Sequence, residues 1–348
     1  MSCIIAVGDP HVQTSNLPEV DLFIVKLCSL IKERKPEMVV ILGDILHTHE
    51  RLHTSALNKA YEIVDKVRAC CDRVILVVGN HDMINNQVHL TNDHWMNGMK
   101  EWDGITVVDT VITEKVGNGE WMICPYVFPG RFVEALETYS EPQRWKEVTG
   151  IFAHQEFRGC KMGAIESAEG DHWDLNSPLV VSGHIHSRQR PQENVYYPGS
   201  AMQHAFGEST KNIIPVIHLD EDGSVKDIEE VDLCLPRKKI VTVCVEDIDE
   251  WQCPKSDDKI RLTIKGDMNE FKTLKKSKKY KELVKKGVKV VFKPLKTVME
   301  TSEGIVSNEN FSSVLKELVV KEKDPYLYSV WEQVLNDKIV HPKDIMVL

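Results

Sequence analysis

The feature that most constrains this chain is an apolar run that recurs and each time ends in a glycine followed by polar side chains. Three such runs lie near the N-terminus, at residues 3–7, 38–42 and 74–78. Apolar residues at the spacing of amphipathic helices separate them, over residues 20–34 and 55–69. Continuous apolar strands that alternate with helices are typical of a mainly parallel sheet, so we expect an α/β fold.

Later parts of the chain add further predicted strands. Residues 150–153 and 179–181 are apolar runs that again end in polar side chains. The remaining predictions are strands of a second sheet layer at 105–108 and 121–126, closing strands at 196–200 and 213–219, and a hairpin turn at 220–223. The catalytic unit is expected to end near Pro236.

Polar residues that follow five of these strands form the candidate site. Because ligands in open α/β sheets gather at the carboxyl ends of the strands, we expect these side chains to lie close together. They are Asp9, His11, Asp44, Asn80, His154, His184 and His186. Taken alone, the two histidines of Gly183-His184-Ile185-His186 are a weak signal, since near-adjacent histidines on a turn are more often solvated than bound to metal. The upstream strand ends are what favour a metal site.

The chemistry of these side chains indicates two metal ions rather than one. Seven oxygen and nitrogen ligands are too many for a single ion, and a bridging carboxylate, which we assign to Asp44, lowers the repulsion between two dications. Ligands without thiolate favour manganese or iron over structural zinc. Two ions ~3.5–4 Å apart bind a phosphate between them and acidify the attacking water, so phosphoester hydrolysis is the predicted reaction class.

Composition excludes several classes of protein. Nine scattered cysteines without a Cys-x-x-Cys pair indicate neither a disulfide framework nor a zinc ribbon, and a reducing compartment fits best. No apolar run approaches the ~18 residues of a membrane span, and the N-terminus lacks the basic segment of a signal peptide. The formal charge is −10, yet residues 272–296 hold eleven lysines and one acid. That stretch is either a site for an anionic partner or a solvated surface.

A resemblance to a known family rests on five motifs. They are Asp9-x-His11, Gly43-Asp44-x-x-His47, Gly79-Asn80-His81-Asp82, His154 and Gly183-His184-x-His186. In this order they resemble the calcineurin-like metallophosphoesterases over roughly residues 1–220. His47, together with Tyr197-Pro198-Gly199-Ser200 and the following Phe206-Gly207-Glu208, is similar to SbcD-type nucleases, the nuclease subunits of the Mre/Rad repair complex and of its phage counterparts. Histidines outside the motifs are interpreted as core or surface residues: His49, His53, His89, His94, His172 and His218.

The resemblance implies a fold and a division of roles. The fold is a two-layered β-sandwich flanked by helices over residues 1–236, a small α+β capping domain over 237–300, and a linker with C-terminal helices over 301–348. One metal is implied on Asp9, His11, Asp44 and His186, and the second on Asp44, Asn80, His154 and His184. Manganese is preferred, with Mg²⁺ or Fe²⁺ as alternatives. His81 is implied to stabilise the phosphorane or to protonate the leaving oxygen, with support from His47.

The same resemblance implies partners. DNA, especially its ends, is the expected anionic partner of the lysine-rich stretch, and the candidate contacts are Lys275, Lys276, Lys278 and Lys279. The sequence has no P-loop motif, so ATP dependence is expected to come from a coiled-coil ATPase of the SbcC or Rad type. That partner is expected to bind the apolar face of residues 311–319 and the cluster at 326–331; packing onto their own domain is the alternative. We also expect a homodimer, no membrane contact, and a cytoplasmic location in a bacterium or a virus-infected cell.

Three functions therefore remain to be distinguished. The first is a manganese-dependent DNA exonuclease and endonuclease in DNA end processing, recombination and repair, working with the ATPase partner. The second is a phosphomonoesterase or phosphoprotein phosphatase, which shares all five motifs. The third is a binding or scaffold subunit without catalysis, against which the intact ligand set argues.

Overall fold

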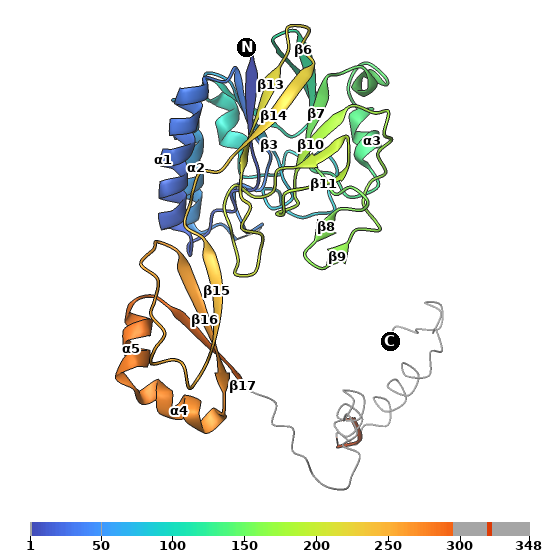
Figure 1. Cartoon of the computed structure of the whole chain (residues 1–348). Coiled ribbons are helices and arrows are strands. Elements are labelled where there is room, and N and C mark those ends of the chain that lie inside the picture. Colours follow the sequence, from blue (N-terminus) through green and yellow to red (C-terminus); the bar gives the residue numbers. More distant parts are fainter. Residues whose placement is uncertain (1, 50, 295–318, 322–348) are drawn as a thin grey trace. The chain divides into compact units, whose positions relative to one another are not determined.

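Two six-stranded sheets stack against each other in the computed structural model, which describes residues 2–49, 51–294 and 319–321 (Figure 1). The first sheet contains, in spatial order, β14 (Val225–Val231), β13 (Ile214–Leu219), β1 (Cys3–Val7), β2 (Met38–Ile41), β3 (Val74–Val77) and β4 (Ile105–Val108). The second contains β11 (Gln189–Gln192), β12 (Val195–Tyr197), β10 (Leu179–Gly183), β7 (Gly150–His154), β6 (Gly119–Cys124) and β5 (Ile112–Val116). The predicted α/β fold with layered sheets and flanking helices is confirmed.

Most strand pairs run in parallel, as predicted, and the exceptions lie toward the edges. β1 to β4 are mutually parallel, as are β6, β7, β10 and β12. β13 and β14 are antiparallel partners joined by the predicted turn at residues 220–223, where the Gly223 N–H donates to the Asp220 carbonyl at 3.0 Å. The carboxyl ends of the parallel strands therefore meet along one edge of each sheet.

Alternation along the buried strands divides the core into layers. In β1, Ile4 and Ala6 face the second sheet, whereas Ile5 and Val7 face the helices on the outer side. The inter-sheet layer includes Trp121 of β6, whose ring stacks at 4.6 Å on that of Phe152. Outer layers are covered by α1 (Leu17–Arg34) and α2 (Thr54–Arg68) on the first sheet, and by α3 (Phe132–Leu136) with nearby loops on the second. Figure 1 shows α1 and α2 side by side.

One predicted strand belongs to the other layer. Residues 105–108 were expected in the second sheet, but β4 pairs in parallel with β3, and Val74 is opposite Ile105. The segment reaches that position through a short 3-10 helix, η1 (Asn97–Glu101). Its central residues are only half-buried, as suits an edge strand. A short apolar run indicates that a strand is buried but not which strand it pairs with, and this explains the error.

A third sheet, of three parallel strands, has its own apolar cluster. It consists of β15 (Lys238–Cys244), β16 (Lys259–Gly266) and β17 (Lys289–Pro294), with α4 (Met268–Lys276) and α5 (Lys278–Lys285) between the last two. The single helix expected over 269–286 is interrupted at Ser277, whose hydroxyl accepts the N–H of Tyr280 at 3.1 Å and caps α5. The division at residue 236 stays a prediction.

The chain separates into two compact units, Met1–Pro294 and Leu295–Leu348. The expected C-terminal helices and their partner-binding face lie outside the described residues, apart from 319–321. Within the described ranges, no helix is both long enough and apolar enough to span a membrane.

Candidate metal centre

The predicted ligands come together where the strands of both six-stranded sheets end. Asp9 and His11 follow β1, Asp44 follows β2, and Asn80 follows β3. From the second sheet, His154 is the last residue of β7, and the segment with His184 and His186 follows β10. The order of strands in two separate sheets thus places seven residues, from five points in the sequence, in one region.

Asp44 lies at the centre of this group. Asp9, His11 and Asp44 each offer a ligand atom within 4.8 Å of the others, and the same holds for Asp44, His154 and His184. The two sets share only Asp44, which is the position expected of a bridging carboxylate. His11 Nε2 lies 3.5 Å from Asp44 Oδ2.

The two remaining ligands complete the sets. His186 Nε2 lies 2.9 Å from His11 Nε2, on the side of Asp9 and His11. Asn80 Oδ1 lies 2.9 Å from both His154 Nε2 and His184 Nδ1, on the opposite side. The seven predicted ligands therefore form two neighbouring groups around Asp44, and their assignment to two metal ions stays a prediction.

The protonation of His154 shows that a cation suits this position. Its Nδ1 donates to the Leu42 carbonyl at 2.6 Å, so in the neutral ring Nε2 carries a lone pair. That atom faces two acceptors, Asp44 Oδ2 at 3.2 Å and Asn80 Oδ1 at 2.9 Å. Burial alone would lower the pKa of His154, but the charge and hydrogen bond of Asp44 raise it to about 9. A proton or a metal ion is needed between these groups.

Asp9 supplies a second indication that these residues suit a cation. It is fully buried, and its Oδ2 has no hydrogen-bond partner among the described residues. Its Oδ1 accepts the N–H of His184 at 2.9 Å. Burial, followed by the charge of Asp44, raises the pKa of Asp9, although the histidines around it lower it. A buried carboxylate oxygen without a donor is costly unless a metal binds it, so these residues fit the predicted centre.

Glycines at the strand ends let the ligands approach one another. A Cβ on Gly79 would lie 2.3 Å from Asp44 Oδ1, and one on Gly43 would lie 2.5 Å from His154 Nδ1. Gly183 would place a Cβ 2.8 Å from the same nitrogen. Any side chain at these positions would occupy the space of the ligands.

Four of the ligands have an unusual backbone conformation. The φ angles of Asp9, His11, Asp44 and His184 are 36°, 43°, 49° and 79°, in the left-handed region that residues with a Cβ rarely adopt. Such conformations persist only where surrounding contacts hold them, and they cluster at functional sites. The chain turns sharply after these strands so that consecutive side chains can face one centre.

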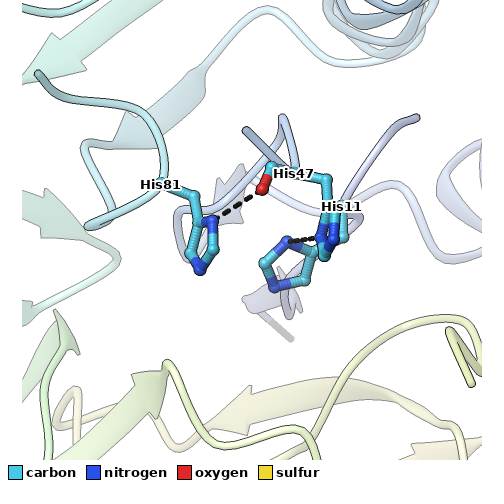
Figure 2. A group of neighbouring side chains, drawn as sticks. All are labelled: His11, His47 and His81. Atoms are coloured by element: carbon cyan, nitrogen blue, oxygen red, sulfur yellow. Dashed lines mark hydrogen bonds between the residues drawn. The ribbon is translucent and has the colours of Figure 1, made fainter. Parts of the chain in front are cut away.

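The predicted catalytic histidines lie beside His11 (Figure 2). His81 Nδ1 donates to the main-chain carbonyl of His47 at 2.7 Å, which leaves Nε2 free, and the His81 N–H donates to Asp44 Oδ1 at 2.8 Å. The His47 ring instead faces His11, with 3.4 Å between their Nδ1 atoms. His47 therefore supports His81 through its backbone and supports a metal ligand through its imidazole. Burial lowers the pKa of both His47 and His81.

Two further histidines adjoin the centre although sequence reasoning did not select them. His49, interpreted as outside the site, stacks on the His81 ring at 4.4 Å. His204 donates from Nε2 to the Asp9 carbonyl at 2.9 Å, and its ring lies 5.0 Å from that of His11. His204 belongs to the loop after β12, and no motif marks it. The spacing of His49 after His47 was the only available signal.

Asp82, the last residue of the third motif, joins two ligand-bearing loops. Its carboxylate is 3% exposed and accepts four N–H groups. These are the backbone N–H groups of Ile45 (3.1 Å), Leu46 (3.3 Å) and Gly79 (3.1 Å) and the indole N–H of Trp95 (2.9 Å). Burial and the charge of Asp44 raise the pKa of Asp82 to about 7. The loop that carries Asp44 is thereby fixed relative to the loop that carries Asn80.

Two carboxylates lie behind the histidines that follow β10. Glu156 Oε2 is 3.9 Å from His184 Nε2, and Glu208 Oε1 is 3.6 Å from His186 Nδ1. Glu208 also accepts the N–H groups of His204 and Ala205, both at 2.8 Å. Carboxylates in this position orient metal-binding imidazoles and raise their basicity.

Two cavities are lined by residues of the centre or by residues that contact it. One, of about 880 Å³, is lined by His47, His49 and Arg51 from the loop before α2 and by Asn85 from the loop after β3. The other, of about 870 Å³, lies over His184 and His186 and is also lined by Met162, Phe206 and Lys161. Residues of the candidate centre, or residues that contact them, therefore border space in which groups of a substrate could lie.

The candidate DNA-binding lysines differ in their contacts. Lys279 donates to the carbonyls of Asp249 (2.9 Å) and Trp251 (2.7 Å), so two of its three N–H groups serve the small three-stranded unit itself. Lys275 lies 5.1 Å from the centroid of the Phe271 ring, and Lys278 is 3.9 Å from Glu282. Lys276 is exposed at the end of α4.

Comparisons with known proteins agree with this site. The family model described as Calcineurin-like phosphoesterase matches residues 4–188. The chain is 47% identical over 278 residues to "Putative phosphoesterase 244L" of Invertebrate iridescent virus 6, covering 79% of this chain and 98% of that protein. It is 40% identical over 336 residues to "Putative phosphoesterase 078R" of Invertebrate iridescent virus 3, covering 95% and 96% of the two chains.

Solved structures resemble the chain more distantly. A dimetal phosphatase from Danio rerio has a TM-score of 0.42 and 11% identity, with 63% of this chain and 93% of that chain covered. The phosphoesterase Yfce from E. coli has a TM-score of 0.32 and 14% identity, with 66% and 99% covered. The family match and the two viral relatives show that the chain belongs to the calcineurin-like phosphoesterases, a family with a dinuclear metal site, and the structure brings together residues that could hold such a site.

Proposed function

We propose that the protein is a manganese-dependent DNA nuclease that hydrolyses phosphodiester bonds in DNA end processing, recombination and repair. The observation that carries this proposal is a pair of separate cavities, of about 880 and 870 Å³, one lined by His47 beside His11 and the other by His184 and His186. A phosphodiester has a substituent on each of two ester oxygens and needs space on both sides. A small phosphomonoester has only one substituent and would occupy only one of the two cavities.

The residues of the chain have distinct roles in this reaction. Two bound metal ions would supply Lewis acidity to the phosphate and a lowered pKa to the attacking water. Asp9, His11, Asp44 and His186 would hold one ion, and Asn80, His154 and His184 would hold the other together with Asp44. Because the His81 Nδ1 donates to the His47 carbonyl, its Nε2 would donate a hydrogen bond or a proton to the leaving oxygen only when the ring is protonated on both nitrogens.

Partners of the nuclease follow from the same proposal. Lysines of α4 and α5 would contact the DNA backbone without reading sequence. A coiled-coil ATPase of the SbcC or Rad type would bind the apolar face of residues 311–319 and the cluster at 326–331 and supply ATP dependence, and two copies of the chain would form a dimer. The relatives come from iridescent viruses, so we propose that the protein works in the cytoplasm of a virus-infected cell.

Digestion of end-labelled linear duplex DNA by the full chain tests the proposal. With Mn²⁺ we expect release of mononucleotides or short fragments, lower activity with Mg²⁺, and none from Asp44→Ala. His81→Ala should lose activity while still binding Mn²⁺, whereas the matched variant His172→Ala, at a histidine outside the centre, should retain it. Intact DNA in a tube where 4-nitrophenyl phosphate is hydrolysed would replace the nuclease with a phosphomonoesterase.

A further inference from the structure

A small hairpin borders the cavity over His184 and His186. Its strands, β8 (Lys161–Met162) and β9 (Ile165–Glu166), are antiparallel, with Met162 opposite Ile165. Gly163 begins the two-residue turn with a φ of 65°, a conformation for which glycine is the favoured residue. The nearby chain therefore projects as a defined two-stranded element rather than as an irregular loop.

The base of this hairpin is fixed. The Gln189 side chain accepts the Lys161 N–H at 2.7 Å and donates to the Lys161 carbonyl at 2.9 Å. The backbones of Ser167 and Cys160 are joined at 2.8 Å, and Cys160 is fully buried. The orientation of the hairpin is thus set by residues of the second sheet and of the core.

The tip of the hairpin is apolar and exposed. Met162 and Ile165, which are directly opposite each other and so share one face, are 41% and 68% exposed. Met162 lines the cavity together with Phe206 from the loop after β12, and Lys161 adds a cation beside them. Apolar and aromatic side chains next to a positive charge are the combination that binds unstacked nucleobases with their phosphates.

The residues that line the cavity indicate which part of a substrate would lie in it. His184 and His186, two of the proposed metal ligands, line this cavity, so a phosphate held at the metals would place one of its substituents here. His49 stacks on His81 and lines the other cavity, which places the leaving oxygen on that side. The group over His184 and His186 is therefore the one that stays on the phosphate.

We propose that the hairpin tip and Phe206 bind the nucleobase of the nucleotide that remains on the phosphate during cleavage. This inference rests on the proposed nuclease function and specifies its substrate. Apolar side chains inserted beside a base also favour DNA in which that base is already unpaired, as it is at a frayed end.

Two small phosphodiesters with the same leaving group test the inference. Thymidine 5′-(4-nitrophenyl) phosphate carries a nucleobase on the retained side, and methyl 4-nitrophenyl phosphate does not. We expect the full chain with Mn²⁺ to hydrolyse the thymidine ester with the higher kcat/KM. Met162→Asp should lower the ratio of the two kcat/KM values by about fivefold or more, the fold-change expected for loss of one base contact, whereas Met162→Leu should restore it.

Control variants distinguish loss of base binding from misfolding and from failure of the proposed nuclease function. Leu175→Asp changes another exposed aliphatic residue, which does not line either cavity, and should leave the ratio unchanged. Binding of Mn²⁺, measured as the rise in Tm, should be equal in all variants. A ratio near one in the unaltered chain, or no change in Met162→Asp, overturns the base-binding role while the nuclease stands. Failure to hydrolyse either ester overturns both.

Discussion

Replacement of Asp82 by alanine should destabilise the metal centre more than any other change outside the ligands. The carboxylate accepts four N–H groups from three segments, at 2.9 to 3.3 Å. An unpaired buried N–H group costs ~1–3 kcal/mol, and a water in the vacated space would satisfy some of them. We therefore expect the free energy of unfolding to fall by ~3–5 kcal/mol, a large part of the ~5–15 kcal/mol typical of a domain.

Asparagine at position 82 should lower the free energy of unfolding less than alanine does. Its one acceptor oxygen can keep the N–H groups of Ile45 and Leu46, whereas its amide would face the N–H of Gly79. Loss of a negative charge beside Asp44 offsets part of that conflict, so a decrease of ~1 kcal/mol is expected. Asp174→Ala, at an exposed aspartate, is the matched control and should change stability by less than ~0.5 kcal/mol.

Urea unfolding with a chelator present measures the global effect, and amide hydrogen exchange measures the local one. In Asp82→Ala, exchange at Ile45 and Leu46 should accelerate at least tenfold, because ~1.4 kcal/mol corresponds to a factor of ten. Mn²⁺ should also raise the Tm less than in the unaltered chain, since the Asp44 and Asn80 loops are no longer joined. A loss below ~1 kcal/mol with unchanged exchange would refute the view that Asp82 fixes these loops.

Three other predictions concern metal, acid and salt. Saturating Mn²⁺ at a hundredfold excess over its Kd should stabilise the chain by ~2.7 kcal/mol per site; Asp44→Asn should remove both sites in a metal analysis and Asp9→Asn only one. Burial lowers the pKa of His94, whose Nε2 forms a hydrogen bond with Asp109 at 3.2 Å, so the stabilising neutral form is present above pH ~6.5 and is lost as pH falls. In urea unfolding with a chelator present, the difference in stability between the unaltered chain and His94→Asn should therefore shrink between pH 7 and pH 5. A constant difference would contradict this. Glutamine at Lys275, Lys276 or Lys278 should make the plot of log K for DNA binding against log salt concentration shallower by ~0.9 for each phosphate contact removed, as measured by fluorescence anisotropy. An unchanged slope would show that these lysines form a solvated surface.

Much of the fold could be predicted because the buried strands are continuous apolar runs. The helix expected at 20–34 is α1, and that at 55–69 is α2, with ends shifted by a few residues. The sheet to which residues 105–108 belong could not be predicted, because the composition of an edge strand does not indicate which strand it pairs with. The break at Ser277 was also hidden, because lysines continue on both sides of it.

The ligands could be identified for a related reason. Each follows a strand, and the rule that ligands gather at the carboxyl ends of strands needs no tertiary detail. His204 and Glu208 reach the centre from a loop whose path depends on side-chain contacts with Asp9 and His186, which no local pattern records. The division of labour within His47, with the backbone toward His81 and the ring toward His11, likewise depends on coordinates.

The left-handed backbone at Asp9, His11, Asp44 and His184 has an evolutionary consequence. Each such residue costs ~1–2 kcal/mol in the folded chain, and the two buried carboxylates repel each other when no metal is bound. Glycine at one of these positions would relieve the backbone and, at an aspartate, the repulsion as well. Descendants that lose catalysis by such a change would remain well folded, so selection for stability cannot preserve this enzyme. Only selection for the reaction itself keeps these four residues in place.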